Sequence, residues 1–216
     1  MIAIALGKAG FGVTISGRNS SELSDTARSL PEGMAQEVVG DLGDPMMPQR
    51  IIDEALGHWG HVDVLVNNAG VAPLRNVKDT DAELITKTMQ INTIAPTKLV
   101  AGLWNHWAEG SGGCVINISS ISGSDPFPGF LAYGMSKAAL DGLTRSVHIE
   151  GAPAGIRSFG LALGAVETKM LRTIVTEEQF PTSQTLAPEE VASKVLELID
   201  SGADEMRGTT IRFMRE

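Results

Sequence analysis

A tyrosine, a lysine and a serine in the stretch NISSISGSDPFPGFLAYGMSK, residues 117–137, have the types and spacing of an acid–base site. Tyr133 stands four residues before Lys137 at the start of a predicted helix, so both side chains share one face. A phenol has a pKa of about 10, and a nearby cation lowers that value toward neutral pH. Ser120 ends the preceding predicted strand, where its hydroxyl can hold a substrate oxygen beside the phenol. The alternative is an ordinary helix start followed by a solvated lysine.

Asparagines and small residues at two other places support the acid–base interpretation. The segment VLVNNAG, residues 64–70, puts Asn68, Ala69 and Gly70 at the carboxyl end of a predicted strand, where backbone approaches a ligand closely. Asn92 lies inside a long predicted helix. Asparagine is unfavourable in a helix interior unless its side-chain amide forms hydrogen bonds there. For Asn92 the alternative is a bond that stabilises a kink next to Pro96. These features together are more specific than any one of them.

Helical and strand patterns alternate along the whole chain and position these residues. The predicted strands cover 12–16, 35–39, 62–66, 114–118, 156–161 and 209–213, and the predicted helices cover the segment before Gly10 and residues 20–29, 48–59, 80–107, 132–149 and 188–199. This order predicts a single α/β domain over residues 1–216, with a parallel sheet covered by helices on both faces. The irregular stretch 167–187 is expected to lie over a site.

The charge balance and the cysteine count limit the function classes. The chain has 17 Lys and Arg against 26 Asp and Glu, a formal net charge of -9, which disfavours binding to nucleic acid or to an anionic membrane surface. Cys114 is the single cysteine, so the sequence offers no disulfide framework and no thiolate metal cluster, as in a reducing compartment. No apolar run has the length of a signal peptide or a membrane span. We therefore expect a cytoplasmic protein without metal, nucleic-acid or membrane partners.

Taken together, NNAG, Asn92, the SS pair before a loop and YGMSK resemble the short-chain dehydrogenase/reductase family over nearly the whole chain. The resemblance implies a Rossmann-like doubly wound sheet and an oxidoreductase that moves hydride between a nicotinamide cofactor and a small carbonyl or alcohol substrate. It implies that Tyr133 is the general acid/base and that Ser120 orients the substrate oxygen. It further implies that Lys137 holds the nicotinamide ribose and lowers the Tyr133 pKa, and that Asn92 anchors a water that relays protons.

The same resemblance assigns residues to the cofactor. The NAG motif matches the strand end beside the adenine ribose, Asp41 matches an acidic residue that meets the adenine, and Thr168 matches a threonine that reaches the cofactor's amide or phosphates. The residues that match the family's cofactor-binding positions are Asp41, Asn68, Ala69, Gly70, Tyr133, Lys137 and Thr168.

Cofactor choice depends on the residues that follow the predicted strand at 12–16. An NAD enzyme uses a carboxylate there to bind the ribose 2′-hydroxyl, whereas a 2′-phosphate needs a cation and is repelled by that carboxylate. Gly17 and Arg18 occupy the place in SGRN, with no acid. The sequence therefore favours NADP(H) over NAD(H). The alternative is that Arg18 is a surface arginine after a strand.

The N-terminal part departs from the family pattern. The family begins with a strand and a glycine-rich turn, TGxxxGIG, that binds the pyrophosphate. Here GKAGFG, residues 7–12, follows a helix and precedes a strand, so we interpret it as a helix stop with Gly10 in the left-handed conformation. On the resemblance, the first strand and its turn, about twenty residues, are missing from this chain. We expect a late start codon or a shortened form of a longer reductase.

Two functions stay open on the sequence. The first is an NADP(H)-dependent reductase of the group that includes 3-oxoacyl-thioester and small alcohol or ketone reductases. The second is a catalytically silent relative that acts as a binding or scaffold subunit. The complete set of four catalytic residues favours the enzyme, whereas the missing glycine-rich turn favours the silent subunit and leaves cofactor binding by this chain open. The resemblance also implies a homodimer or homotetramer.

Overall fold

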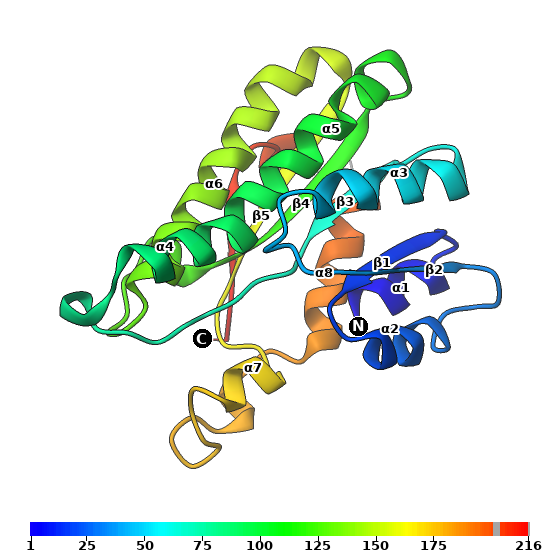
Figure 1. Ribbon diagram of the computed structural model, residues 1–216. Helices are drawn as coiled ribbons and strands as arrows, with labels where there is room; N and C mark the ends of the chain where they lie inside the picture. The colour runs from blue at the N-terminus through cyan, green and yellow to red at the C-terminus, as the bar shows by residue number, and fades with distance from the viewer. Residues whose placement is uncertain (201–203, 216) are drawn as a thin grey trace.

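Helices and parallel strands alternate through the computed structural model, which describes residues 1–200 and 204–215 (Figure 1). The strands are β1 (Val13–Gly17), β2 (Ala35–Val39), β3 (Val64–Asn67), β4 (Gly113–Ser120), β5 (Ile156–Leu163) and β6 (Thr210–Phe213). The helices are α1 (Ile2–Lys8), α2 (Ser20–Ala27), α3 (Met47–Trp59), α4 (Ala82–Met89), α5 (Ala95–Glu109), α6 (Leu131–Gly151), α7 (Lys169–Arg172) and α8 (Pro188–Asp200).

The strands form two parallel sheets. β1 pairs with β2, and the larger sheet has the order β3-β4-β5-β6. Figure 1 shows the β1–β2 pair set apart from the larger sheet, and within the described ranges no strand lies between β1 and β3. The predicted α/β fold with parallel strands and helices is confirmed.

Side chains alternate along β4 between two apolar layers, as a strand buried on both faces requires. Cys114, Ile116 and Ile118 pack with residues of β5, α1 and α8, whereas Val115 packs with residues of α3, α5 and α6. The helices therefore cover both faces of the sheet. Cys114 is 1% exposed, and burial raises the pKa of its thiol to about 11.

The chain turns at Gly10 between α1 and β1. Gly10 has a φ of 94°, in the left-handed region, and the Phe11 N–H donates to the Leu6 carbonyl at 3.1 Å. A glycine with positive φ and a backbone bond to the last helical turn are typical of a helix stop. The interpretation of GKAGFG as a helix stop is therefore confirmed.

The predicted helix over 80–107 is divided into three parts. The Asp81 side chain caps α4 by accepting from the Leu84 N–H at 2.8 Å. A π-helical segment, Gln90–Ile94, joins α4 to α5, and Pro96 lies in the first turn of α5, where its missing N–H costs nothing. Because π segments are rare and occur frequently at functional sites, this break points to the residues inside it.

Candidate active site

One large cavity, of about 1210 Å³, contains most of the predicted site residues. It lies at the carboxyl ends of β3 and β4, where parallel strands form the usual crevice for ligands. The start of α6 and the segment after β5 also line it. Of the predicted residues, Asn68, Ala69, Gly70, Ser120, Tyr133, Lys137 and Thr168 belong to its lining. Arg18, Asp41 and Asn92 do not.

Tyr133 and Lys137 lie one turn apart on α6, as the four-residue spacing predicts. The Lys137 Nζ is 5.7 Å from the centroid of the Tyr133 ring. Burial raises the pKa of the Tyr133 phenol above its ordinary value, and a smaller interaction with the Ser120 hydroxyl lowers it. The pKa of the phenol is thus raised, whereas the resemblance implies that Lys137 lowers it, because burial outweighs the interaction with Ser120. The phenol is therefore protonated at neutral pH.

Lys137 is buried at the base of the cavity, with 3% of its surface exposed. Its Nζ donates to the Ile118 carbonyl at 2.7 Å. Burial lowers the pKa of Lys137 to about 8, and the negative charge of Asp141 acts in the opposite direction. Asp141 was not among the predicted residues. Its position one further turn along α6 is the signal that could have identified it.

Ser120 is held in place by the turn that follows β4. Its Oγ accepts from the Ser122 N–H at 3.2 Å and from the Ser122 hydroxyl at 2.9 Å. Two aromatic rings lie nearby in the cavity wall, Phe130 with its centroid 5.7 Å from that of Tyr133, and Phe127 at 6.4 Å from Phe130. The hydroxyl and the phenol therefore meet at an apolar wall.

Asn92 lies in the π-helical segment and is fully buried. Its Oδ1 accepts from the Val71 N–H at 2.8 Å, and its Nδ2 donates to the Val71 carbonyl at 2.9 Å and to the Ser136 Oγ at 2.9 Å. The side chain therefore binds the loop after β3 to α6, beside Lys137. Both amide hydrogens have partners within the protein, and the proton-relaying water at Asn92 stays a prediction.

Gly70, in the loop after β3, lies close to the side chains of Asn92 and Lys137. A Cβ at this position would lie 3.3 Å from the Asn92 Oδ1 and 3.7 Å from the Lys137 Nζ. A larger residue would displace one of these groups. Gly70 thus allows the backbone of the NAG motif to approach Lys137. The other two residues of the motif, Asn68 and Ala69, are exposed.

Arg18 and Asp41 come together at the carboxyl ends of β1 and β2. The Arg18 Nη1 lies 3.9 Å from the Asp41 Oδ2, with side chains 67% and 51% exposed. Asp41 also accepts from the Gly43 N–H at 2.8 Å. An exposed pair at this distance contributes little to stability, so both side chains are free to rearrange around a ligand.

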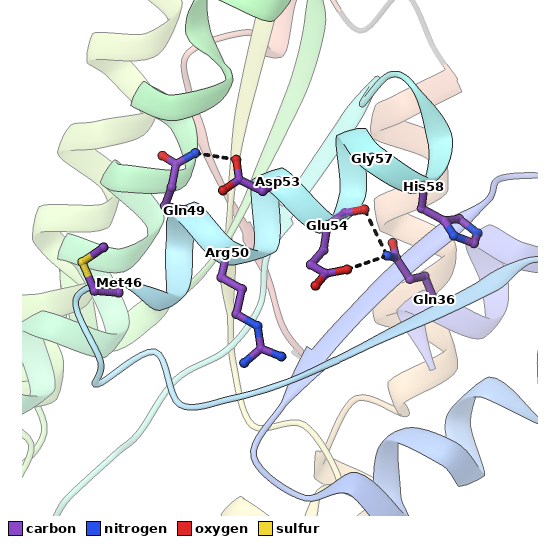
Figure 2. A pocket seen from close by; sticks show the side chains of 8 residues that line it. All are labelled: Gln36, Met46, Gln49, Arg50, Asp53, Glu54, Gly57 and His58. Atoms are coloured by element: carbon purple, nitrogen blue, oxygen red, sulfur yellow. Dashed lines mark hydrogen bonds between the residues drawn. The ribbon is translucent and has the colours of Figure 1, made fainter.

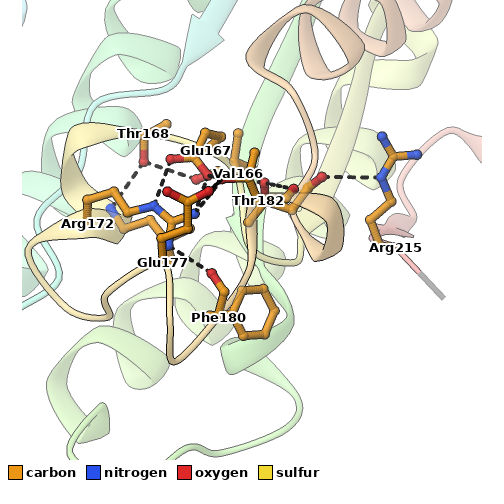
Figure 3. A network of polar contacts seen from close by, with 10 residues as sticks. Val166, Glu167, Thr168, Arg172, Glu177, Phe180, Thr182 and Arg215 are labelled. Carbon is orange, nitrogen blue, oxygen red and sulfur yellow. Dashed lines mark hydrogen bonds and ion pairs between the residues drawn. The ribbon is translucent and has the colours of Figure 1, made fainter.

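Thr168 begins a segment that covers one side of the cavity. Its Oγ1 accepts from the Leu171 N–H at 3.2 Å and donates to the Val166 carbonyl at 3.2 Å. Figure 3 shows the polar network that fixes the segment's shape, with the Arg172 guanidinium directed at the Glu167 carboxylate. This ion pair lowers the pKa of Glu167.

Further bonds close the same network. Arg172 donates from Nε to Glu167 at 2.8 Å and from Nη1 to the Phe180 carbonyl at 2.9 Å, and Thr185 accepts through its carbonyl from Arg215 at 3.2 Å. The segment over 167–187 therefore lies beside the cavity, as predicted, with an internal clamp between Glu167 and Arg172.

A second hollow, on the outer face of α3, does not resemble a reactive site. Figure 2 shows its polar side chains bonded to one another: Gln49 donates to Asp53 at 2.8 Å, and Gln36 donates to the Glu54 carbonyl at 3.0 Å. Among the described residues no group of His, Cys, Asp and Glu side chains could hold a metal ion, and no helix in these ranges has the length and apolarity to cross a membrane.

Comparison with known proteins finds one family and many relatives. Residues 1–179 match the family model described as short chain dehydrogenase. The human protein named dehydrogenase/reductase SDR family member 4 is 32% identical over 222 aligned positions, which cover 97% of this chain and 80% of that protein.

Solved structures agree with this match. A 3-ketoacyl-(acyl-carrier-protein) reductase from Brucella melitensis, complexed with NADH, superposes with a TM-score of 0.89 at 25% identity, covering 98% of this chain and 89% of that one. A gluconate 5-dehydrogenase from Burkholderia cenocepacia, in complex with NADP and tartrate, superposes with a TM-score of 0.88 at 25% identity, covering 99% and 88%. Similar proteins are therefore oxidoreductases that bind either nicotinamide dinucleotide.

Proposed function

Because the chain belongs to the short-chain dehydrogenase family, we propose that it transfers hydride between NADP(H) and a carbonyl or alcohol substrate. The observation that carries the proposal is the cluster of Ser120, Tyr133 and Lys137 at one end of the cavity. A phenol and a hydroxyl beside a buried ammonium can bind a carbonyl oxygen and supply its proton.

The residues around Lys137 fit the nicotinamide half of the cofactor. The cavity has room for a large ligand, and Gly70 leaves the Lys137 Nζ accessible where a Cβ would approach it to 3.7 Å. Lys137 would donate to the ribose hydroxyls, and Thr168 would bond to the amide or the phosphates. When bound, the reduced cofactor would supply the hydride that is added to the substrate carbon, and the oxidised cofactor would accept the hydride that is removed from it.

The protein's own groups hold and move the proton. In the direction of reduction, the Ser120 hydroxyl donates to the carbonyl oxygen and orients it, and the Tyr133 phenol gives that oxygen its proton as hydride reaches the carbon. The product is an alcohol, and the phenolate that remains is stabilised by the Lys137 ammonium. Since burial raises the pKa of Tyr133, the phenol starts protonated at neutral pH, which suits reduction.

Arg18 supports the preference for NADP(H). Its guanidinium is exposed just after β1, and Asp41 is 3.9 Å from it. A 2′-phosphate bound there would replace the weak ion pair with a charge-assisted bond. Similar structures hold NADH or NADP, so the preference rests on Arg18 alone. Isothermal titration with NADPH and NADH is expected to show tighter binding of NADPH, and Arg18→Ala is expected to remove the difference.

The apolar wall beside Tyr133 favours a substrate with an apolar part. Phe127 and Phe130 line the cavity next to the phenol. Together with the similarity to a 3-ketoacyl-(acyl-carrier-protein) reductase, this supports a 3-oxoacyl thioester or a small ketone. We further propose a homodimer or homotetramer, on the ground that Met135 and Ile149 on α6 are exposed. A cytoplasmic location is proposed on the ground that the sequence has a single cysteine, as in a reducing compartment.

Replacement of Tyr133 by phenylalanine tests the proposal. Tyr133→Phe removes the proton donor and keeps the ring, so turnover of a 3-oxoacyl thioester with NADPH is expected to fall by at least about a hundredfold. NADPH binding, followed by fluorescence titration, is expected to stay within about twofold. Retained turnover in Tyr133→Phe would remove the phenol from its role.

A silent binding subunit is the second candidate, favoured by one observation. In the residues that the structure describes, no glycine-rich turn joins the end of a strand to the start of a helix, which is the order that a pyrophosphate cradle requires. If the chain binds neither NADPH nor NADH at millimolar concentration, the silent subunit is the better assignment. Binding together with Tyr133-dependent turnover selects the enzyme.

A further inference from the structure

Asp141 is an acidic residue of α6 to which the proposed reaction gives no part. It lies four residues after Lys137, and helical geometry puts the two side chains on the same face, one turn apart. Tyr133 lies one turn before Lys137. The proton donor, the cation and the acidic residue therefore follow one another along one face of α6.

The end of β4 contacts both Lys137 and Asp141. The Ile118 carbonyl accepts from the Lys137 Nζ at 2.7 Å, and the Ser119 hydroxyl donates to the Lys137 carbonyl at 3.4 Å. The Ser119 hydroxyl also interacts with the Asp141 carboxylate and lowers its pKa. The strand thus holds the lysine and the acidic residue against the same part of the sheet.

The turn after β4, residues 121–123, approaches the carboxylate closely. A Cβ at Gly123 would lie 3.1 Å from the Asp141 Oδ2 and 3.2 Å from the Lys137 carbonyl carbon. Both distances are shorter than an ordinary van der Waals contact, so a larger residue would displace one of these groups. The carboxylate therefore lies close to the helical turn that carries Lys137.

One oxygen of Asp141 is buried without a hydrogen bond. Asp141 is half-buried, and its Oδ1 has no partner among the described residues. Burial accordingly raises the pKa of Asp141, whereas Ser119, Thr210, Arg145 and Lys137 lower it. A buried polar atom without a partner costs free energy and calls for an explanation. The buried ammonium of Lys137 provides one.

The other charged groups near Asp141 are exposed or already paired. Arg145, one turn further along α6, is exposed. β6 places Arg212 on the same face as the threonine that interacts with Asp141, and Arg212 pairs with Asp125 at 2.6 Å. β4 and the turn after it contain no Asp, Glu, Lys, Arg or His. Lys137 is thus the buried cation beside Asp141 in the part of the chain that the structure describes.

Three more elements pack on α6 without adding a charge at Asp141. In α5, His106 accepts from the Val62 N–H at 3.2 Å, and in β5, Arg157 donates to the Ile199 carbonyl at 3.0 Å. The remaining charged residues of α4 and α5 are exposed: Glu83, Lys87, Lys98 and Glu109.

The negative charge of Asp141 acts on a lysine that is close to losing its proton. Burial lowers the pKa of Lys137 to about 8, and Asp141 opposes that fall. Without this opposition the pKa of Lys137 would approach 7, and the side chain would be partly neutral at neutral pH. In the proposed reaction the ammonium stabilises the Tyr133 phenolate, so its charge limits the pH range of turnover.

We propose that Asp141 is a positioning residue, which keeps the Lys137 ammonium charged and thereby sets the upper pH limit of the reaction. It acts through Lys137, since it is not among the residues that line the cavity. The limit on turnover rests on the proposed function, whereas the effect on Lys137 does not.

Two variants of α6 that each remove one negative charge test the proposal. Asp141→Asn keeps the shape of the side chain, and its matched control is Glu150→Gln, at an exposed position near the end of the same helix. The lysine Cε atoms are labelled with carbon-13, and the Lys137 signal is the one missing from Lys137→Met. NMR follows this signal against pH in the wild type and in both variants.

The pKa of Lys137 is expected to change in one variant alone. From about 8 in the wild type, it is expected to fall to about 7 in Asp141→Asn, because the negative charge one turn away is removed. In Glu150→Gln it is expected to stay within about 0.2 of the wild-type value, because an exposed and distant charge is screened.

Turnover of a 3-oxoacyl thioester with NADPH gives a second readout. The alkaline limb of the kcat/KM profile is expected to move to lower pH in Asp141→Asn, by as much as the Lys137 pKa falls, and to stay in place in Glu150→Gln. At about pH 6, where Lys137 is charged in all three proteins, kcat/KM of Asp141→Asn is expected to stay within about twofold of the wild type. A merely structural role of Asp141 would lower turnover at every pH.

Three results would overturn the proposal. One is the same Lys137 pKa in the wild type and in Asp141→Asn. Another is an equal fall in both variants, because the effect would then come from the net charge of the protein. The third is an alkaline limb that stays in place although the Lys137 pKa falls.

The two readouts separate this proposal from the proposed function. If the wild type turns over no substrate, the proposed function fails, and the NMR titration alone decides the assignment of Asp141. Should Asp141→Asn not fold, the same titration is made on Asp141→Ala, which leaves no buried oxygen at this position.

Discussion

Lys137 carries its ammonium group on a side chain that is only 3% exposed. The hydrogen bond to the Ile118 carbonyl and the charge of Asp141 offset part of the desolvation, and the pKa still falls to about 8. A lysine held in this way is charged at pH 7 and neutral at pH 9. The cation that Tyr133 requires is therefore present near neutral pH and lost on mild alkalinisation.

The burial of Lys137 gives the stability of the protein a specific pH dependence. The folded-state pKa, about 8, lies below the unfolded value of 10.5, so between these two values the unfolded state binds more protons and stability rises with pH. We expect the free energy of unfolding of the wild type, relative to Lys137→Met, to increase by up to about 3 kcal/mol between pH 8 and pH 10.5.

Urea unfolding at a series of pH values measures this difference. Groups other than Lys137 titrate in both proteins and cancel, apart from the neighbours Tyr133 and Asp141, whose own pKa values are raised by burial. A constant difference between wild type and Lys137→Met from pH 7 to pH 10.5 would contradict the lowered pKa.

The sequence predicts the cluster of Ser120, Tyr133 and Lys137 better than it predicts the residues packed around that cluster. Tyr133 and Lys137 share a face because helical periodicity fixes it, and Ser120, at the end of β4, interacts with Tyr133 near the start of α6. The same periodicity places Asp141 one turn beyond Lys137, and this spacing is the signal that the sequence offers for it. The contact between Gly70 and Lys137 depends on two segments far apart in the chain.

At the scale of elements, the π-helical segment is the feature that propensity does not predict. Residues 80–107 have an uninterrupted helical pattern, and the break at 90–94 arises because Asn92 binds Val71 and Ser136, which lie on other elements. The predicted kink at Pro96 falls at the same place, because Pro96 follows the π-helical segment by two residues and cannot donate to the Asn92 carbonyl four residues before it. The tertiary bonds of the buried Asn92 amide and the missing N–H of Pro96 thus meet at this break.

Loss of the Asn92 amide is expected to destabilise the protein. Asn92→Ala leaves the Val71 N–H and the Val71 carbonyl without their side-chain partner and removes the bond that the Ser136 Oγ accepts, and we expect a loss of about 2–4 kcal/mol in the free energy of unfolding. The matched control is Gln90→Ala in the same segment, which removes one long bond of 3.4 Å to the Leu42 carbonyl. Equal losses in both variants, measured by urea unfolding, would show that Asn92 does not hold the segment.

At the scale of the whole molecule, the alternation of elements predicts the parallel sheet and its helical layers. β2 has the same bounds, 35–39, in the prediction and in the structure, and the other strands differ by a few residues at their ends. The pairing of the strands is set by contacts that a single sequence does not reveal. The strands form two sheets because, among the described residues, no strand pairs with both β1 and β3.

Two sheets of unequal size are expected to unfold with unequal free energies. A two-stranded sheet is marginal by itself, whereas β4 and β5 lie inside two apolar layers. Native-state hydrogen exchange is expected to give amides of β1 and β2 opening free energies at least about 2 kcal/mol below those of β4 and β5. A single opening free energy for both sheets would show that they form one cooperative unit.

The chain also contains its own reporter of the larger sheet. Cys114, its single cysteine, is 1% exposed in β4, and its thiol has a pKa of about 11. Both the shielding and the scarcity of thiolate prevent maleimide from reacting while β4 is intact. Each alkylated molecule is one in which the interior of the larger sheet has opened, so a mass spectrum after timed labelling counts those openings without an engineered probe.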